Sequence, residues 1–111
     1  MRDMLKARCE QVARLLIPAV RAVVAERLIS SGMTQSVAAR IMGVTQPAVN
    51  YYIKSKRGHR LSQMLKKDDE ISRLIDQLAD ALKNGEASEK DVKKAICEIC
   101  KLAVNRGYLA E

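Results

Sequence analysis

The sequence has very few aromatic residues. Three tyrosines are its whole aromatic content, 3% of 111 residues, and phenylalanine and tryptophan do not occur. Because 48% of the residues are still hydrophobic, the core must be built from Leu, Ile, Val, Ala and Met, most of which favour helices. The length is typical of one domain. The composition therefore favours a single helical domain over residues 1–111.

Long hydrophobic runs are also missing. No apolar run approaches the roughly 18 residues of a membrane span. The N-terminal stretch MRDMLKARCEQ carries charges where a secretory signal peptide has an apolar segment. We therefore expect a cytoplasmic protein with no membrane partner.

Acidic residues are absent from residues 27–67, which carry eight basic side chains. The segment before it has a net charge of +2 and the segment after it −3, so the total of +7 comes from the middle of the chain. A segment with charge of one sign is either disordered or faces an anion. Apolar residues recur in it at helical spacing, which favours the second interpretation.

The same helical spacing continues through most of the chain, and strand-like alternation is nowhere sustained. It predicts an all-α fold of five to seven helices. Pro18 should end or kink the first helix, and Gly32 should end the second. The predicted helices span about residues 3–17, 19–30, two short helices within 34–56, 69–83 and 88–106. Residues 60–67 form either a separate helix or the start of the fifth one.

Residues 34–56 have the spacing of two short helices joined by a tight turn. Thr34 is placed to cap the first helix and Thr45 the second. Gly43 tolerates the positive φ that the turn needs, and Pro47 falls in the first turn of the second helix. This pattern is typical of a helix-turn-helix. The residues predicted to face inward are Ala38, Ala39, Met42, Val44, Val49 and Ile53.

The second helix of this unit, about Gln46 to Ser55, is predicted to enter the major groove of DNA. The amides of Gln46 and Asn50 can pair with adenine edges, and Ala48 can touch a thymine methyl group. Lys54 lies further along the same outer face. The predicted phosphate contacts are Gln35 at the start of the first helix, Tyr51, and the basic residues Lys56, Arg57 and Arg60, with Lys54 serving either role.

The stretch MTQSVAARIMGVTQPAVNYYIKSKRG resembles the helix-turn-helix of the lambda-repressor-like, or XRE-type, transcriptional regulators. The stretches LLIPAVRAVVAERL and CEICKLA are similar to an archaeal branch of that class. The resemblance implies that Gln46 is the main base reader, that Ala48, Asn50 and Lys54 lie nearby, and that Gln35 binds a phosphate. It implies no cofactor, and no small-molecule effector is assigned.

The chain has three cysteines, Cys9, Cys97 and Cys100, and a single histidine, His59. A structural zinc site usually takes four protein ligands, so no metal site is predicted within one chain. Cys97 and Cys100, one helical turn apart, can form a redox pair, whereas the apolar neighbours of Cys9 and Cys100 favour buried thiols. If the source is a hyperthermophilic archaeon, as the resemblance permits, a disulfide joining Cys9 to Cys97 or Cys100 is a further candidate.

These features predict a sequence-specific transcriptional regulator that binds double-stranded DNA. One helix-turn-helix reads only a few base pairs, so we expect a homodimer, with residues 69–106 as the packing or dimerisation region. Two alternatives stay open: an architectural DNA-binding protein without sequence preference, and a redox- or metal-responsive regulator using Cys97 and Cys100. No Gly-rich phosphate loop or nucleophile with a nearby base is present, so an enzyme is not expected.

Overall fold

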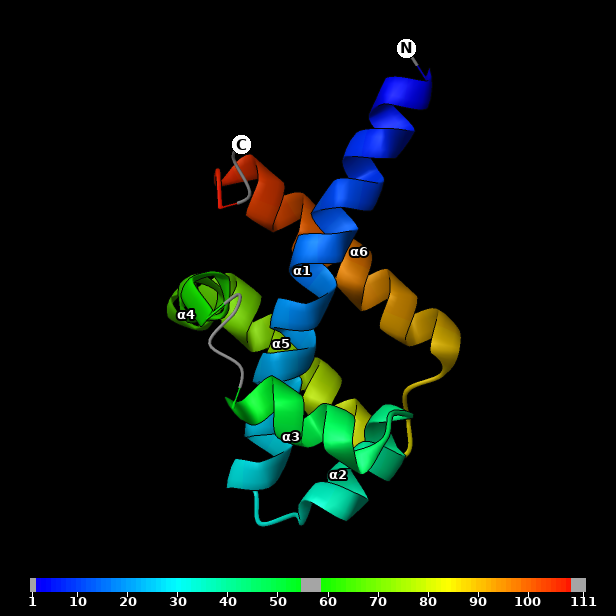
Figure 1. Ribbon diagram of the computed structural model, residues 1–111, viewed down its shortest axis with the longest axis vertical. Coiled ribbons are helices and arrows are strands. Elements are labelled where there is room, and N and C mark those ends of the chain that lie inside the picture. Colours follow the sequence, from blue (N-terminus) through cyan, green and yellow to red (C-terminus); the bar gives the residue numbers. More distant parts are fainter. Residues whose placement is uncertain (1, 55–58, 109–111) are drawn as a thin grey trace.

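The computed structural model describes the backbone of residues 2–54 and 59–108, and the side chains of residues 14–54 and 60–108. Within these ranges the chain has six helices and no strand, which confirms the predicted all-α class. The helices are α1 (Arg2–Ser30), α2 (Gln35–Met42), α3 (Gln46–Lys54), α4 (His59–Lys67), α5 (Asp69–Lys83) and α6 (Glu89–Asn105), as labelled in Figure 1.

α1 is the central element, and it contacts each of the other five helices. Its 29 residues span roughly 43 Å at 1.5 Å per residue, close to the 44 Å longest dimension of the molecule. Figure 1 shows α1 running along this axis, with α2 and α3 near its C-terminal end. Its buried residues are Leu16, Ala19, Val20, Val23, Val24, Ala25 and Leu28.

Pro18 does not end the first helix, so the prediction of two separate helices over residues 3–30 is wrong. α1 continues through this proline as one helix. Proline lacks the N–H that would bond the carbonyl of Arg14, four residues earlier. Both Pro18 and Arg14 are exposed, so water can bond that carbonyl in place of the missing donor. Because Leu16 and Ala19 on either side are buried, packing against the core outweighs the lost hydrogen bond.

Gly32 ends α1, as predicted. Its φ of +102° lies in the region that favours glycine, and it turns the chain away from the helix axis. The Met33 amide then donates to the Leu28 carbonyl at 3.3 Å. This turn leads directly into the cap of α2.

One hydrophobic cluster holds all six helices together. α2 contributes Ala38 and Ala39, α3 contributes Val49, and α4 contributes Leu65. α5 adds Ile71, Ile75, Leu78 and Ala79, and α6 adds Ile99 and Ala103. The apolar residues of the last two helices therefore face the core of the same chain. Val92 packs half-buried against this core, and Ile96 is also half-buried.

Residues 60–67 belong to a separate helix, α4, which resolves the two alternatives left by the sequence. The Asp68 side chain accepts a hydrogen bond from the Ile71 amide at 3.0 Å and caps α5, so the two helices are distinct. At the start of α6, Ser88 and Asp91 form a capping box, with both hydrogen bonds at 3.1 Å.

Candidate nucleic-acid interface

The turn between α2 and α3 has the predicted geometry. Thr34 Oγ1 accepts from the Val37 amide at 3.2 Å and caps α2. Gly43 adopts φ +70° and ψ +30°, and the Val44 amide behind it donates to the Ala39 carbonyl at 3.0 Å. This left-handed residue ends α2 and reverses the chain within one residue.

The start of α3 is fixed by the next cap. Thr45 Oγ1 accepts from the Ala48 amide at 3.2 Å. Pro47 follows at the second position of α3, where its missing N–H leaves no hydrogen bond unmade. The N-terminus of α3 is therefore pre-formed, with an exposed Gln46 as its first residue.

The inner side of α3 is anchored on α1 and α2. Val49 is fully buried, and Ala38 and Ala39 of α2 are 0% and 4% exposed. These two small residues let α3 approach α2 closely. Ile53 of α3 packs half-buried against the same core, together with Met42 and Val44. α3 therefore has one fixed face and one face left to solvent.

The outer side of α3 carries the predicted base-reading residues. Gln46 and Lys54 are exposed, and Tyr51 is 55% exposed. Ala48 and Asn50, predicted to be exposed, are half-buried, because they flank the fully buried Val49 and so lie at the edges of the outer face. Each keeps part of its surface accessible, and the five residues line one side of a short helix.

The predicted phosphate contacts are only partly within the described residues. Gln35 is half-buried at the first position of α2, and Arg60 is exposed at the second position of α4. Lys56 and Arg57 lie outside the described residues, as does Ser55, the predicted end of the second helix. Within the described residues, the predicted phosphate contacts therefore come from α2, α3 and α4.

Ion pairs neutralise two of the basic residues that the sequence assigned to the positive segment. Arg27 Nε lies 3.0 Å from Asp76 Oδ1, and Lys66 Nζ lies 3.2 Å from Glu26 Oε2. These pairs tie α1 to α5 and α4. Within residues 14–54 and 60–108, the basic residues of this segment that are exposed and form no ion pair are Arg40, Lys54, Arg60 and Lys67. Of these four residues, Arg40 lies on α2, Lys54 on α3, and Arg60 and Lys67 at opposite ends of α4.

The sequence interpretation missed Arg21 of α1. Its Nη1 donates a hydrogen bond to the Tyr52 hydroxyl of α3 at 3.4 Å, across 31 residues of sequence. Tyr52 packs against the core, and its ring meets the Tyr51 ring edge to face, with centroids 6.2 Å apart. A further cation therefore stands beside the last turns of α3. The sequence held one signal for it, since Arg14 and Arg21 lie seven residues apart and share a helix face.

The two cysteines of α6 lie in different surroundings. Cys97 is exposed, and Cys100 packs half-buried against the core. No disulfide joins them, and the side chain of Cys9, their predicted partner, lies outside the described residues. Among the side chains placed by the structure, no group of three or more His, Cys, Asp or Glu residues is arranged to hold a metal ion.

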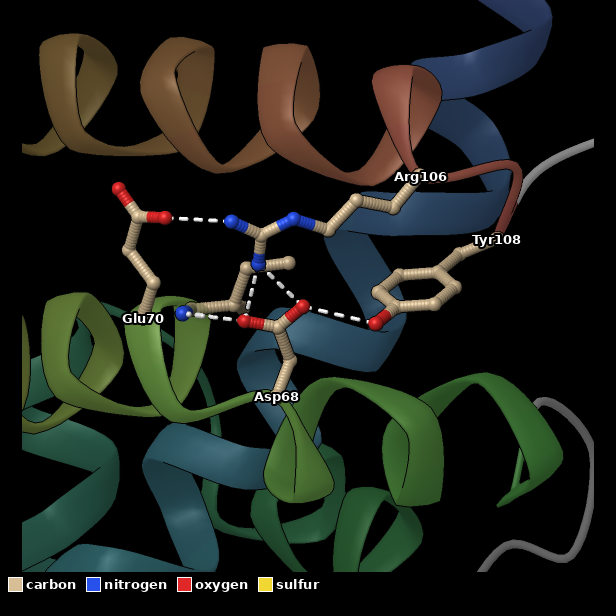
Figure 2. A network of polar contacts seen from close by, with 5 residues as sticks. Asp68, Glu70, Arg106 and Tyr108 are labelled. Atoms are coloured by element: carbon tan, nitrogen blue, oxygen red, sulfur yellow. Dashed lines mark hydrogen bonds and ion pairs between the residues drawn. The ribbon is translucent and has the colours of Figure 1, made fainter.

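A polar network at the end of α6 was not foreseen from the sequence (Figure 2). The Asp68 side chain is 5% exposed and accepts hydrogen bonds from Arg106 and, at 2.7 Å, from the Tyr108 hydroxyl. Arg106 also pairs with Glu70. Burial raises the pKa of Asp68, but the bonds from Arg106, the Ile71 amide and Tyr108 outweigh it and lower the pKa to about 2.

These contacts shift the pKa values of their donors as well. The hydrogen bond to Asp68 raises the pKa of Arg106 and of Tyr108. Gly107, with φ +74°, turns the chain so that Tyr108 faces back toward the α4–α5 junction. The network therefore connects the C-terminal end of α6 to the junction of α4 and α5.

Replacing Gly43 by alanine should destabilise the protein by about 1 kcal/mol. A Cβ at this position would meet no atom within 4 Å, so the cost is the left-handed backbone conformation alone. Denaturant unfolding of both proteins measures this difference. A variant with unchanged stability would show that the turn does not hold Gly43 at positive φ.

No family model matches the chain, and no curated protein or solved structure is significantly similar to it. None of the helices in the described ranges has the length and apolar character needed to cross a membrane. The functional interpretation therefore rests on the chain's own residues: the outer face of α3 and the basic residues around it.

Proposed function

We propose that the protein is a cytoplasmic, sequence-specific transcriptional regulator that binds double-stranded DNA through α3. The proposal rests on how this helix is anchored, capped and exposed. Its inner side is anchored by the fully buried Val49, its N-terminus is capped by Thr45, and Gln46 stands exposed at its first position. The resemblance of residues 33–58 to lambda-repressor-like regulators supports the same function, as does that of LLIPAVRAVVAERL and CEICKLA to an archaeal branch of the class.

The reading and anchoring tasks fall to different residues. Gln46 and Asn50 offer amides for adenine edges, and Ala48 offers a methyl group for thymine. Lys54 lies on the same outer face. Gln35 and Arg60, at the first turns of α2 and α4, are proposed to hold phosphates on either side of the groove, together with Tyr51.

Selection of bound duplexes from a random DNA pool tests this proposal. A specific regulator should enrich one motif and prefer it over random DNA by about 10³-fold or more. The matched control is the Gln46→Ala variant, which should enrich the motif less strongly while it still binds random DNA. If the protein bound DNA and enriched no motif, it would be an architectural protein that uses only Arg40, Lys54, Arg60 and their neighbours.

We further propose that two copies bind as a homodimer, because one helix-turn-helix reads too few base pairs for high specificity. The buried residues of α5 and α6 pack against the core of the same chain, so the proposed interface uses exposed apolar residues instead. Among the described side chains, the large apolar residues left exposed away from α2 and α3 are Leu15 of α1, 60% exposed, and Val104 of α6, 43% exposed. These residues are proposed to meet a second copy.

Equilibrium sedimentation tests the dimer. We expect a dimer at micromolar concentration and a shift toward monomer in the Leu15→Glu variant. Val37→Glu is the matched control, because Val37 is 37% exposed on α2 and is not assigned to the interface. A wild-type protein that stays monomeric well above micromolar concentration would rule the dimer out. In that case the selected DNA motif should also lack two-fold symmetry.

A further inference from the structure

The cationic face of α1 beside α3 has no role in the function proposed above. Arg21 lies next to Tyr52, in the second half of α3, whereas the proposed reader Gln46 begins that helix. Its contact with the Tyr52 hydroxyl is long and solvent-exposed. A guanidinium has five N–H donors, so this single bond leaves most of them available.

Arg14 extends the same face. Seven residues separate it from Arg21, which in a helix returns the side chain to nearly the same direction about 10 Å further along the axis. Both arginines are exposed, and neither pairs with a carboxylate among the described side chains. Arg27 of the same helix, in contrast, is paired with Asp76. Two uncompensated guanidinium groups therefore lie in line on α1.

We propose that Arg21 and Arg14 form a phosphate-binding ridge on α1, which holds the DNA backbone where it passes the second half of α3. The proposal rests on the DNA-binding function proposed above. Guanidinium groups match phosphate oxygens with paired N–H donors, which makes arginine well suited to this contact. Lys54, two residues after Tyr52 at the end of α3, adds a further exposed charge beside this face.

Tyr52 positions Arg21 in this arrangement. Its ring is held by the core and by Tyr51, so its hydroxyl is a fixed acceptor that restrains the arginine toward α3. A restrained guanidinium loses less conformational freedom when it binds a phosphate. α1 thus serves both as the central core helix and as a contact that widens the footprint on DNA beyond the helix-turn-helix.

The salt dependence of binding to a random-sequence duplex tests the ridge. Each lost phosphate contact should reduce the slope of log K against log salt by about 0.9. We expect this reduction in Arg21→Gln and in Arg14→Gln, and about twice as much in the double variant. If the contribution of a phosphate contact vanishes near 1 M salt, a slope difference of about 0.9 fixes its size at lower salt. The loss of one contact then weakens binding about 15-fold at 50 mM salt and about 4-fold at 200 mM salt.

Three matched variants separate a contact from a general charge effect. Lys101→Gln removes an exposed charge from α6 and should leave the slope unchanged. Arg21→Lys keeps the charge and should restore the slope. Tyr52→Phe removes only the acceptor, so it should keep the slope and weaken binding by about twofold, the value of one exposed hydrogen bond.

The outcomes are distinguishable. If the wild-type protein binds DNA and Arg21→Gln leaves both slope and affinity unchanged, the ridge is refuted while the proposed function stands. The same holds if Lys101→Gln lowers the slope as much as Arg21→Gln does. If the folded wild-type protein binds no duplex at any salt concentration, the proposed function itself fails.

Discussion

Replacing Gln46 by alanine is expected to weaken binding to the selected DNA site by about 1 to 3 kcal/mol, the value of one bidentate contact with a base. Gln46 is exposed at the first position of α3, and the adjacent Thr45 and Pro47 are exposed as well. None of the three side chains packs in the core. The variant should therefore fold normally. Its affinity for random DNA should stay the same, because an amide contributes no counterion release. Titrations with the selected site and with a random duplex measure the two effects.

The control variant is Arg60→Ala. Arg60 is exposed in the first turn of α4 and is assigned to a phosphate. Its removal should weaken all sequences alike and reduce the salt slope by about 0.9. If Gln46→Ala and Arg60→Ala changed the affinities for the selected site and for the random duplex in the same way, the assignment of Gln46 to a base and of Arg60 to a phosphate would be wrong.

The local parts of the candidate site followed from the sequence because they depend on neighbouring residues. The caps at Thr34 and Thr45 and the positive φ of Gly43 each act within four residues. The inward face of α3, with Val49 buried and Ile53 half-buried, follows from helical periodicity alone. These are features that a short window of sequence specifies.

The course of the chain at Pro18 was not predicted, because it depends on which side of the helix faces water. A proline in a helix leaves the carbonyl four residues earlier without its hydrogen bond. The loss of stability is smaller when that carbonyl faces solvent than when it faces the core. Periodicity alone gives no measure of how strongly the buried residues Leu16, Ala19 and Val20 hold the helix against the core. Tertiary packing decided the outcome.

The contacts that connect distant segments could not be predicted from the sequence either. Arg21 meets Tyr52 across 31 residues, and Arg106 meets Asp68 across 38. The acidic run Asp68, Asp69 and Glu70 is typical of a helix start, but no sequence pattern pairs it with Arg106. Only the folded arrangement shows that α6 ends over the start of α5 (Figure 2).

Replacing Asp68 by alanine is expected to destabilise the protein by about 2 to 3 kcal/mol. The substitution removes the cap of α5, worth about 1 kcal/mol, and the charged hydrogen bonds with Arg106 and Tyr108. Ser88→Ala is the matched control, because Ser88 caps α6 in the same way without meeting a distant residue. It should cost only about 1 kcal/mol in denaturant unfolding. Equal losses in the two variants would mean that the network adds nothing to the cap.

Asp68→Asn separates the charge from the cap, because asparagine is also a good N-cap. The pKa of Asp68 is lowered from 3.8 to about 2 by folding, so its ionised form favours the folded state. This stabilisation is complete above the unfolded pKa and is lost as the pH falls through about 4 to 2. A shift of this size corresponds to about 2 kcal/mol.

The wild-type protein should therefore be about 2 kcal/mol more stable than Asp68→Asn at pH 7, and the two stability curves should converge near pH 2. Unfolding measured in steps between pH 7 and pH 2 tests this convergence. Glu70→Gln is the comparison, because Glu70 meets the same Arg106 but is 57% exposed, so its loss should cost no more than about 1 kcal/mol. A difference between wild type and Asp68→Asn that does not shrink in acid would show that the Asp68 carboxylate is not stabilised by its contacts with α6. Asp68 lies at the junction of α4 and α5. Such a result would therefore also mean that the network does not stabilise the contact between this junction and the end of α6.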